Sequence, residues 1–184
     1  METITNPESD AFKKVWEIYE EAFPADERRS LEAQKALFEK WRYRFQAINL
    51  EGQVIGLIAD WTLEGGRERG YHFIEHYAIR KDLRGKGHGS RVLREYIHES
   101  NRRIILETER PTTNDQKRRI KFWENGGLNL NEYDYIQPAY SKEKKPVPMF
   151  LMTWIDELNP KQFEDIRRDI HHYVYCLERP LTSL

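Results

Sequence analysis

The segment IEHYAIRKDLRGKGHGSRVLREYIHE, residues 74–99, decides the fold because a strand, a basic glycine-rich turn and an amphipathic helix follow one another in it directly. Gly85, Gly87 and Gly89 can adopt backbone angles closed to other residues, and they leave room for a ligand against the main chain. The helix after them has an apolar stripe, so its free N-terminal N–H groups and positive dipole end point back at the turn. The segment therefore predicts an anion site, and phosphate is the ligand that such sites typically bind.

The spacing of the glycines disfavours two common phosphate loops. A Walker loop ends in Gly-Lys followed by Ser or Thr, whereas Lys86 is followed by Gly87, and a dinucleotide fingerprint needs two residues between its second and third glycines, where this chain has one. The string RGKGHG, residues 84–89, instead resembles the Arg/Gln-x-x-Gly-x-Gly/Ala loop of the GNAT superfamily of N-acetyltransferases, which binds the pyrophosphate of acetyl-CoA. The alternative is a glycine-rich turn with solvated basic side chains.

A second motif agrees with this resemblance. An apolar strand at Arg102–Pro111 is followed by a helix in which Thr113 and Gln116 have capping-box spacing and Gly126-Gly127 supply the stop. The string QKRRIKFWENGGL, residues 116–128, resembles the family's Asn-x-x-Ala-x-x-Leu-Tyr-x-x-x-Gly-Phe segment. The two motifs occur in the family's order and spacing, and the resemblance covers about residues 43–154.

The resemblance implies an α+β (α/β) fold with a GNAT-like mixed, mostly antiparallel sheet of six to seven strands flanked by helices, and it implies acetyl-CoA as cosubstrate, with no metal. The pantetheine arm is expected to lie like an added strand in a gap between two splayed strands. From the resemblance we expect the cofactor to be bound by Arg84, Gly85, Lys86, Gly87, His88, Gly89 and Ser90 of the loop, by the main chain of Tyr77, Ala78 and Ile79, and by Gln116 and Trp123.

Two positions depart from the family pattern. Trp123 stands where the family often has a tyrosine that protonates the departing thiolate, and an indole N–H cannot serve as an acid. Gln116 stands where an asparagine often contacts the cofactor, and a capping role is its alternative. The acid is therefore missing or moved. Tyr135 and Tyr140, near the expected acceptor site, are candidates to replace it, and ordinary packing is the alternative for both.

Direct attack of an amine on the thioester needs a base, because an alkyl ammonium has a pKa of about 10.4. Glu75 is the first candidate: alternation places it on one face with Phe73 and Tyr77, and burial on a central strand is expected to raise its pKa. The alternative is a structural pairing of Glu75 with an arginine or histidine. Glu107 and Glu109 share a face of the next strand and are the second choice.

His76 is expected to point away from Glu75, which argues against a dyad or metal pair, and no Cys/His spacing of a zinc site occurs. The turn at residues 27–29, Glu-Arg-Arg, either lines the acceptor mouth or is solvated.

Composition and length fit one compact domain. With 184 residues and 39% hydrophobic content the chain can bury a core, and no apolar run approaches the roughly 20 residues of a membrane span. The balance of 30 basic against 31 acidic residues gives no global field for nucleic acid. The single cysteine, Cys176, and the lack of an apolar leader after Met1 predict a cytoplasmic protein without internal disulfides.

Apolar periodicity predicts the remaining elements. A domain at residues 1–158 is expected to be followed by a C-terminal helical extension, residues 159–184, packed on the same domain or on a second subunit. The expected elements are a strand at 1–5, helices at 12–23, 31–41 and 161–177, a hairpin of 43–50 with 54–63, and strands at 71–80, 103–109, 128–136 and 147–154.

These observations predict an acetyl-CoA-dependent N-acetyltransferase that acts on a primary amine, with a small molecule as the first choice of acceptor. A protein N-terminus or lysine is the second choice. A non-catalytic acyl-CoA sensor is the alternative from another class, since the acid position is occupied by Trp123. The sequence leaves open whether the protein is a monomer or a homodimer.

Overall fold

The computed structural model describes residues 1–64, 70–154 and 156–177. The mixed, mostly antiparallel sheet predicted from the sequence is confirmed. The elements, in chain order, are β1 (Glu2–Thr3), α1 (Asp10–Ala22), η1 (Ala25–Glu27), α2 (Leu31–Ala36), η2 (Leu37–Glu39), β2 (Tyr43–Leu50), β3 (Gln53–Leu63), β4 (Tyr71–Ile79), η3 (Lys81–Leu83), α3 (His88–Glu99), β5 (Arg103–Glu109), α4 (Asn114–Asn125), β6 (Leu128–Gln137), β7 (Val147–Trp154) and α5 (Pro160–Tyr173).

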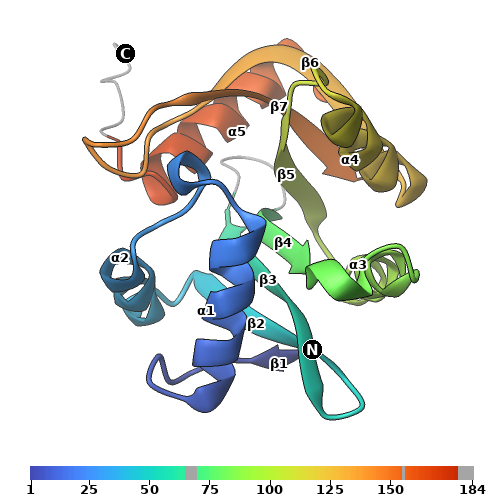
Figure 1. Ribbon diagram of the computed structural model, residues 1–184. Helices are drawn as coiled ribbons and strands as arrows, with labels where there is room; N and C mark the ends of the chain where they lie inside the picture. Colours follow the sequence, from blue (N-terminus) through green and yellow to red (C-terminus); the bar gives the residue numbers. More distant parts are fainter. Residues whose placement is uncertain (65–69, 155, 178–184) are drawn as a thin grey trace.

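The seven strands form one sheet in the order β1-β2-β3-β4-β5-β7-β6. In the described part of the chain, β4 and β5 are the one parallel pair, and they pair only from Tyr71↔Arg103 to Ile74↔Leu106. Beyond these residues β4 stays with β3 while β5 stays with β7. β4 and β5 therefore separate toward their carboxyl ends, and the sheet opens between them (Figure 1).

Helices cover both faces of the sheet and enclose separate apolar clusters. On one face α1 and α5 pack through residues such as Val15, Tyr19 and Ile170. On the other face α3 and α4 pack through residues such as Leu93 and Trp123. Complete capping boxes start two of the helices: Thr113 caps α4, as its spacing with Gln116 predicted, and Asn159 caps α5.

The second predicted helix is shorter than expected. The sequence pattern extended it from Leu31 to Trp41, but α2 ends at Ala36 and continues as a 3-10 turn to Glu39. The side chain of Trp41 is 75% exposed, so no packing offsets the entropy cost of extending the helix to it.

Strand β4 contains a β-bulge that the sequence reading missed. His76 pairs with Ala59 and Ile74 with Asp60, so Glu75 is an extra residue with no partner on β3. The bulge resets the alternation, and Glu75 and His76 both face the α1 side, where both contact Tyr140. The predictions that Glu75 shares a face with Tyr77 and that His76 points away from it are therefore wrong.

The C-terminal helix α5 packs on the sheet of its own chain. Phe163, Ile166 and Ile170 are each at most 6% exposed, and the cluster continues into Val174 and Tyr175 just beyond the helix. Residues 178–184 of the expected extension lie outside the described part. Among the described residues, no helix combines the length and the apolar character needed to cross a bilayer.

Candidate active site

The site is a cavity of about 900 Å³ that starts where β4 and β5 separate. Its walls come from both strands, from the loop before α3, from the start and middle of α4, and from the turn after α1. Of the predicted site residues it is lined by Glu75, Tyr77, Ala78, Ile79, Arg84, Gly85, Gly87, His88, Gly89, Ser90, Glu107, Trp123 and Tyr140. Lys86, Gln116 and Tyr135 are not part of this lining.

The glycine-rich loop has the backbone geometry that an anion site needs. Gly85 and Gly87 have φ of +76° and +82°, which L side chains rarely adopt, and a Cβ built on either would meet no atom within 4 Å. The space over the loop is therefore open, and the first turn of α3 points its free N–H groups at it. Arg84 fixes the loop by donating from Nε to the carbonyl of Ile79 at 2.8 Å. These residues fit a pyrophosphate.

The loop gives a prediction with an internal control. Replacing Gly87 with valine is expected to weaken acetyl-CoA binding at least roughly tenfold, about 1.4 kcal/mol, because a branched side chain strains the turn and fills the space over it. Gly52→Val is the matched control, since Gly52 also has positive φ and open space, but lies in the β2–β3 hairpin. Calorimetry measures both affinities. Equal affinities of Gly87→Val and Gly52→Val would refute the phosphate assignment.

The strip of β4 beyond the bulge can hold an extended ligand through its main chain. Ile58, Leu57 and Gly56 of β3 pair with residues 77–79 from one side, and the other side faces the cavity left by β5. The ring of Tyr77 packs on Trp123 at 5.5 Å, and its hydroxyl donates to the carbonyl of Gly89 at 2.7 Å. Tyr77 thus ties the strip to the glycine-rich loop.

Gln116 serves as a cap. Its Oε1 accepts from the main-chain N–H groups of Thr112 and Thr113, and its Nε2 donates to Glu109 at 3.3 Å. Glu109 also forms an ion pair with Arg119. The observed contacts of Gln116 are therefore those of a capping residue, which was the alternative to cofactor binding.

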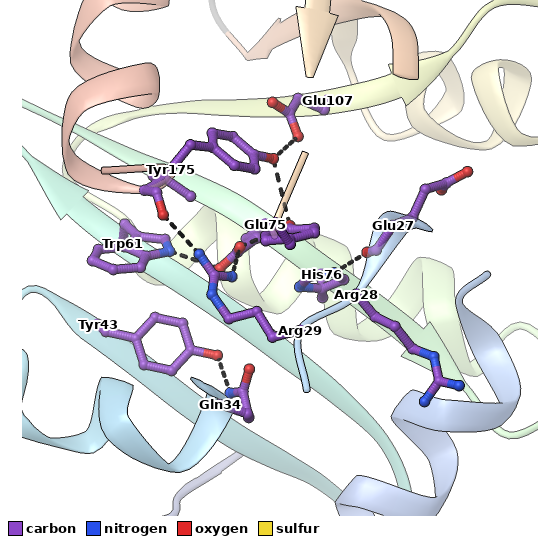
Figure 2. A network of polar contacts seen from close by, with 12 residues as sticks. Glu27, Arg28, Arg29, Gln34, Tyr43, Trp61, Glu75, His76, Glu107 and Tyr175 are labelled. Atoms are coloured by element: carbon purple, nitrogen blue, oxygen red, sulfur yellow. Dashed lines mark hydrogen bonds and ion pairs between the residues drawn. The ribbon is translucent and has the colours of Figure 1, made fainter. Parts of the chain in front are cut away.

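Glu75 is the centre of a buried network (Figure 2). Its side chain is fully buried and forms an ion pair with Arg29, whose side chain is 7% exposed. Trp61 donates to Oε2 at 2.7 Å and Tyr140 donates to Oε1 at 2.8 Å. Burial alone would raise the pKa of Glu75, but Arg29 and the hydrogen bonds outweigh it and lower that pKa. The expectation of a raised pKa is wrong, and the pairing with an arginine is observed.

Glu107 has the opposite environment, although it faces the same cavity. In the described part of the chain its carboxyl makes no ion pair; instead, Tyr175 donates to Oε2 at 2.7 Å and Tyr135 donates to Oε1. Burial raises the pKa of Glu107 to about 8, since two phenols stabilise the carboxylate less than burial destabilises it. The hydroxyls of Tyr140 and Tyr175 lie 3.4 Å apart and link the two carboxyl groups.

Two further polar atoms of buried, cavity-lining residues have no hydrogen-bond partner among the described residues. Nε2 of His76 lies 2.8 Å from the carbonyl of Glu27, so it must carry the proton and donate (Figure 2). Nδ1 of His76 is then a bare lone pair, and burial lowers the pKa of the ring and keeps it neutral. The hydroxyl of Thr108 is the second such atom. Both atoms are suited to form a hydrogen bond with a polar group of the expected amine substrate.

Sequence reasoning missed three residues of the site. Arg29 is separated from Glu75 by 46 residues, and the sequence offered its turn as lining the acceptor mouth or as solvated, without linking it to Glu75. Trp61 read as an ordinary apolar strand residue. Tyr175 lies beyond the family motifs, so nothing tied it to Glu107. Only the tertiary fold identifies these contacts.

A splayed sheet with a glycine-rich anion loop at the opening is the architecture of an acyltransferase that takes its acyl group from coenzyme A. The family model for the acetyltransferase (GNAT) family matches residues 12–127. A solved protein from Bacteroides thetaiotaomicron, assigned to the GNAT family, shares 31% sequence identity over 96% of this chain and 98% of its own, with a TM-score of 0.88. The chain belongs to the GNAT acetyltransferase family, and acetyl-CoA is its cosubstrate.

More distant structures share the fold. A Bacillus subtilis acetyltransferase in complex with CoA has 12% identity and a TM-score of 0.55, with 86% of this chain and 99% of that chain covered. The ribosomal-protein-S18-alanine N-acetyltransferase from Escherichia coli has 14% identity and a TM-score of 0.54, with 83% and 93% covered. The comparison with curated proteins found none that matches.

Proposed function

We propose that this enzyme acetylates a small primary amine by direct attack, with Glu107 as the base. The observation that carries the proposal is a carboxyl group with a pKa of about 8 in the cavity wall where β4 and β5 separate. Acetyl-CoA supplies an activated acetyl carbonyl there. The main chain of residues 77–79 is placed to orient it.

Glu107 suits the transfer of the proton better than its neighbours do. A base works best when its pKa lies near the operating pH. Glu75 has a lowered pKa and is neutralised by Arg29, and Glu109 is paired with Arg119. Once protonated, Glu107 carries a proton whose pKa is close to that of a thiol, about 8.5, so the same group can return the proton to the departing sulfur.

Tyr140 lines the cavity and Tyr135 does not, but the one O–H of Tyr140 already donates to Glu75. Burial and Glu75 raise the pKa of Tyr140 well above 10, so it keeps this proton, and the acid role falls to Glu107. These roles make the indole at Trp123 compatible with turnover.

A small acceptor is the first candidate because side chains from the turn after α1 and from β7 line the same cavity as the cofactor strip. Phe23, Pro24 and Met149 belong to this lining, together with Tyr140. The sensor alternative would gain if all candidate carboxylates were tied up in ion pairs, and within the described residues Glu107 binds two phenols instead. A peptide acceptor is the second candidate, and a cytoplasmic location stays a prediction.

The test is a panel of amines assayed for free CoA. We expect turnover with compact primary amines and not with peptides that present an N-terminus or lysine. We also expect kcat/KM to rise with pH and level off above about 8, since only deprotonated Glu107 accepts a proton. Turnover restricted to peptides would overturn the small-acceptor proposal. A rate that stays flat from about pH 6 to 9 would overturn the role of Glu107.

A further inference from the structure

The segment directly after α5 contacts Arg29 and Glu107, and it lies outside the segment that the family model matches, residues 12–127. The carbonyl of Val174 accepts a hydrogen bond of 2.7 Å from Nη2 of Arg29. The next residue, Tyr175, is 8% exposed and donates its hydroxyl to Glu107 (Figure 2). Through these two contacts the C-terminal segment touches Arg29, which is the partner of Glu75, and Glu107.

The position of Tyr175 is fixed from several sides. Its ring packs on that of Tyr140 at 5.1 Å and lies edge-on to His171 at 6.4 Å. Cys176 adopts left-handed backbone angles with φ of 57°, and the N–H of Leu177 returns to the carbonyl of His171 at 2.9 Å. This turn closes the helix and holds Tyr175 against the sheet.

We propose that Tyr175 is a positioning residue for the transfer reaction, one that acts by holding the Glu107 carboxyl through Oε2. The proposal rests on the proposed function, because it assigns Tyr175 a role only through Glu107. Tyr135 holds the other oxygen, so the two phenols together fix both the orientation and the plane of the carboxyl group. The C-terminal segment is then part of the active site as well as part of the core.

The chemistry of the contact predicts its effect. A phenol that donates to a carboxylate stabilises the ionised form, so Tyr175 keeps the pKa of Glu107 lower than burial alone would set it. Without this hydroxyl, less of the enzyme has Glu107 deprotonated at neutral pH. The loss should therefore be recovered when the pH is raised.

The experiment is Tyr175→Phe in the full chain, with kcat and the KM for acetyl-CoA measured across pH. We expect kcat near neutrality to fall about tenfold, the usual scale of a hydrogen bond to a charged group, with KM unchanged within about twofold. The pH of half-maximal rate should move upward, and the variant should approach the parent at high pH. Carbon-13 NMR of the Glu107 carboxyl should show the same upward move without any turnover.

Tyr133→Phe is the matched control, because its hydroxyl also ties the C-terminal segment, to the carbonyl of Leu158 at 2.8 Å, but away from Glu107. It should leave the pH profile unchanged. The inference is overturned if Tyr175→Phe loses the same share of kcat at every pH, or loses none. In that case the proposed function still stands if Glu107→Gln is inactive. An active Glu107→Gln overturns the proposed function, and the inference with it.

Discussion

Glu107→Gln is expected to lower turnover by roughly 10² to 10⁴ and to leave the affinity for acetyl-CoA nearly unchanged. The amide keeps the shape of the side chain and can still accept from one phenol, but it cannot take up a proton. Stopped-flow or steady-state release of CoA gives the rate, and calorimetry gives the affinity.

Glu109→Gln is the matched control on the same strand. Its carboxylate is already neutralised by Arg119 and capped by Gln116, so we expect a change within about threefold, typical of a residue that moves no proton. A Glu107→Gln enzyme that turns over like Glu109→Gln would return the base role to Glu75 or to water. In that case Glu75→Gln should carry the large loss.

Glu107→Gln also has a pH-dependent effect on stability. The pKa of Glu107 is raised from 4.5 to about 8 in the folded state, so folding favours the protonated form. Glu107 does not lower the free energy of unfolding below about pH 4.5. As the pH rises from there to about 8, its ionisation lowers that free energy, by at most on the order of 5 kcal/mol. The glutamine variant carries no such charge, so its free energy of unfolding relative to the parent should be larger at about pH 9 than at about pH 5.

Arg29→Met is expected to destabilise the protein by about 3–5 kcal/mol, because it leaves the carboxylate of Glu75 buried without a counter-charge. Urea unfolding followed by tryptophan fluorescence measures the change. Adding Glu75→Gln should recover much of the loss, since the double variant removes both charges and keeps the donors Trp61 and Tyr140.

Arg28→Met separates this effect from the loss of any arginine in the turn. Arg28 is the adjacent residue, and its partner Glu20 is 48% exposed, so the pair is a surface one and its loss should cost within about 1 kcal/mol. Equal destabilisation by Arg28→Met and Arg29→Met would show that the buried pair contributes nothing specific. An unrecovered double variant would show that Arg29 acts through Val174 instead.

The sequence predicted what depends on neighbours along the chain. The glycine-rich turn, the capping box of α4 and the alternation of the strands are local patterns; the turn predicted the anion loop, and the family resemblance implied the mixed sheet. It could not predict the bulge at Glu75, because one extra residue leaves the apolar pattern of β4 intact on both sides. Nor could it predict that Glu75 would meet an arginine and Glu107 two phenols. These contacts reverse the expected pKa shift of Glu75, and they are the reason that we propose Glu107 as the base.

The bulge in β4 sets a condition for anyone who exchanges segments between this enzyme and its relatives. The residues before and after Glu75 are out of phase by one, so a strand of the same length that paired with β3 without the bulge would turn its second half over. The aromatic ring at position 77 would then leave Trp123 and enter the acceptor side, and the imidazole at position 76 would leave it. A chimera must therefore take the whole of β4, with the bulge included, or the two halves of the active site will come from incompatible frames.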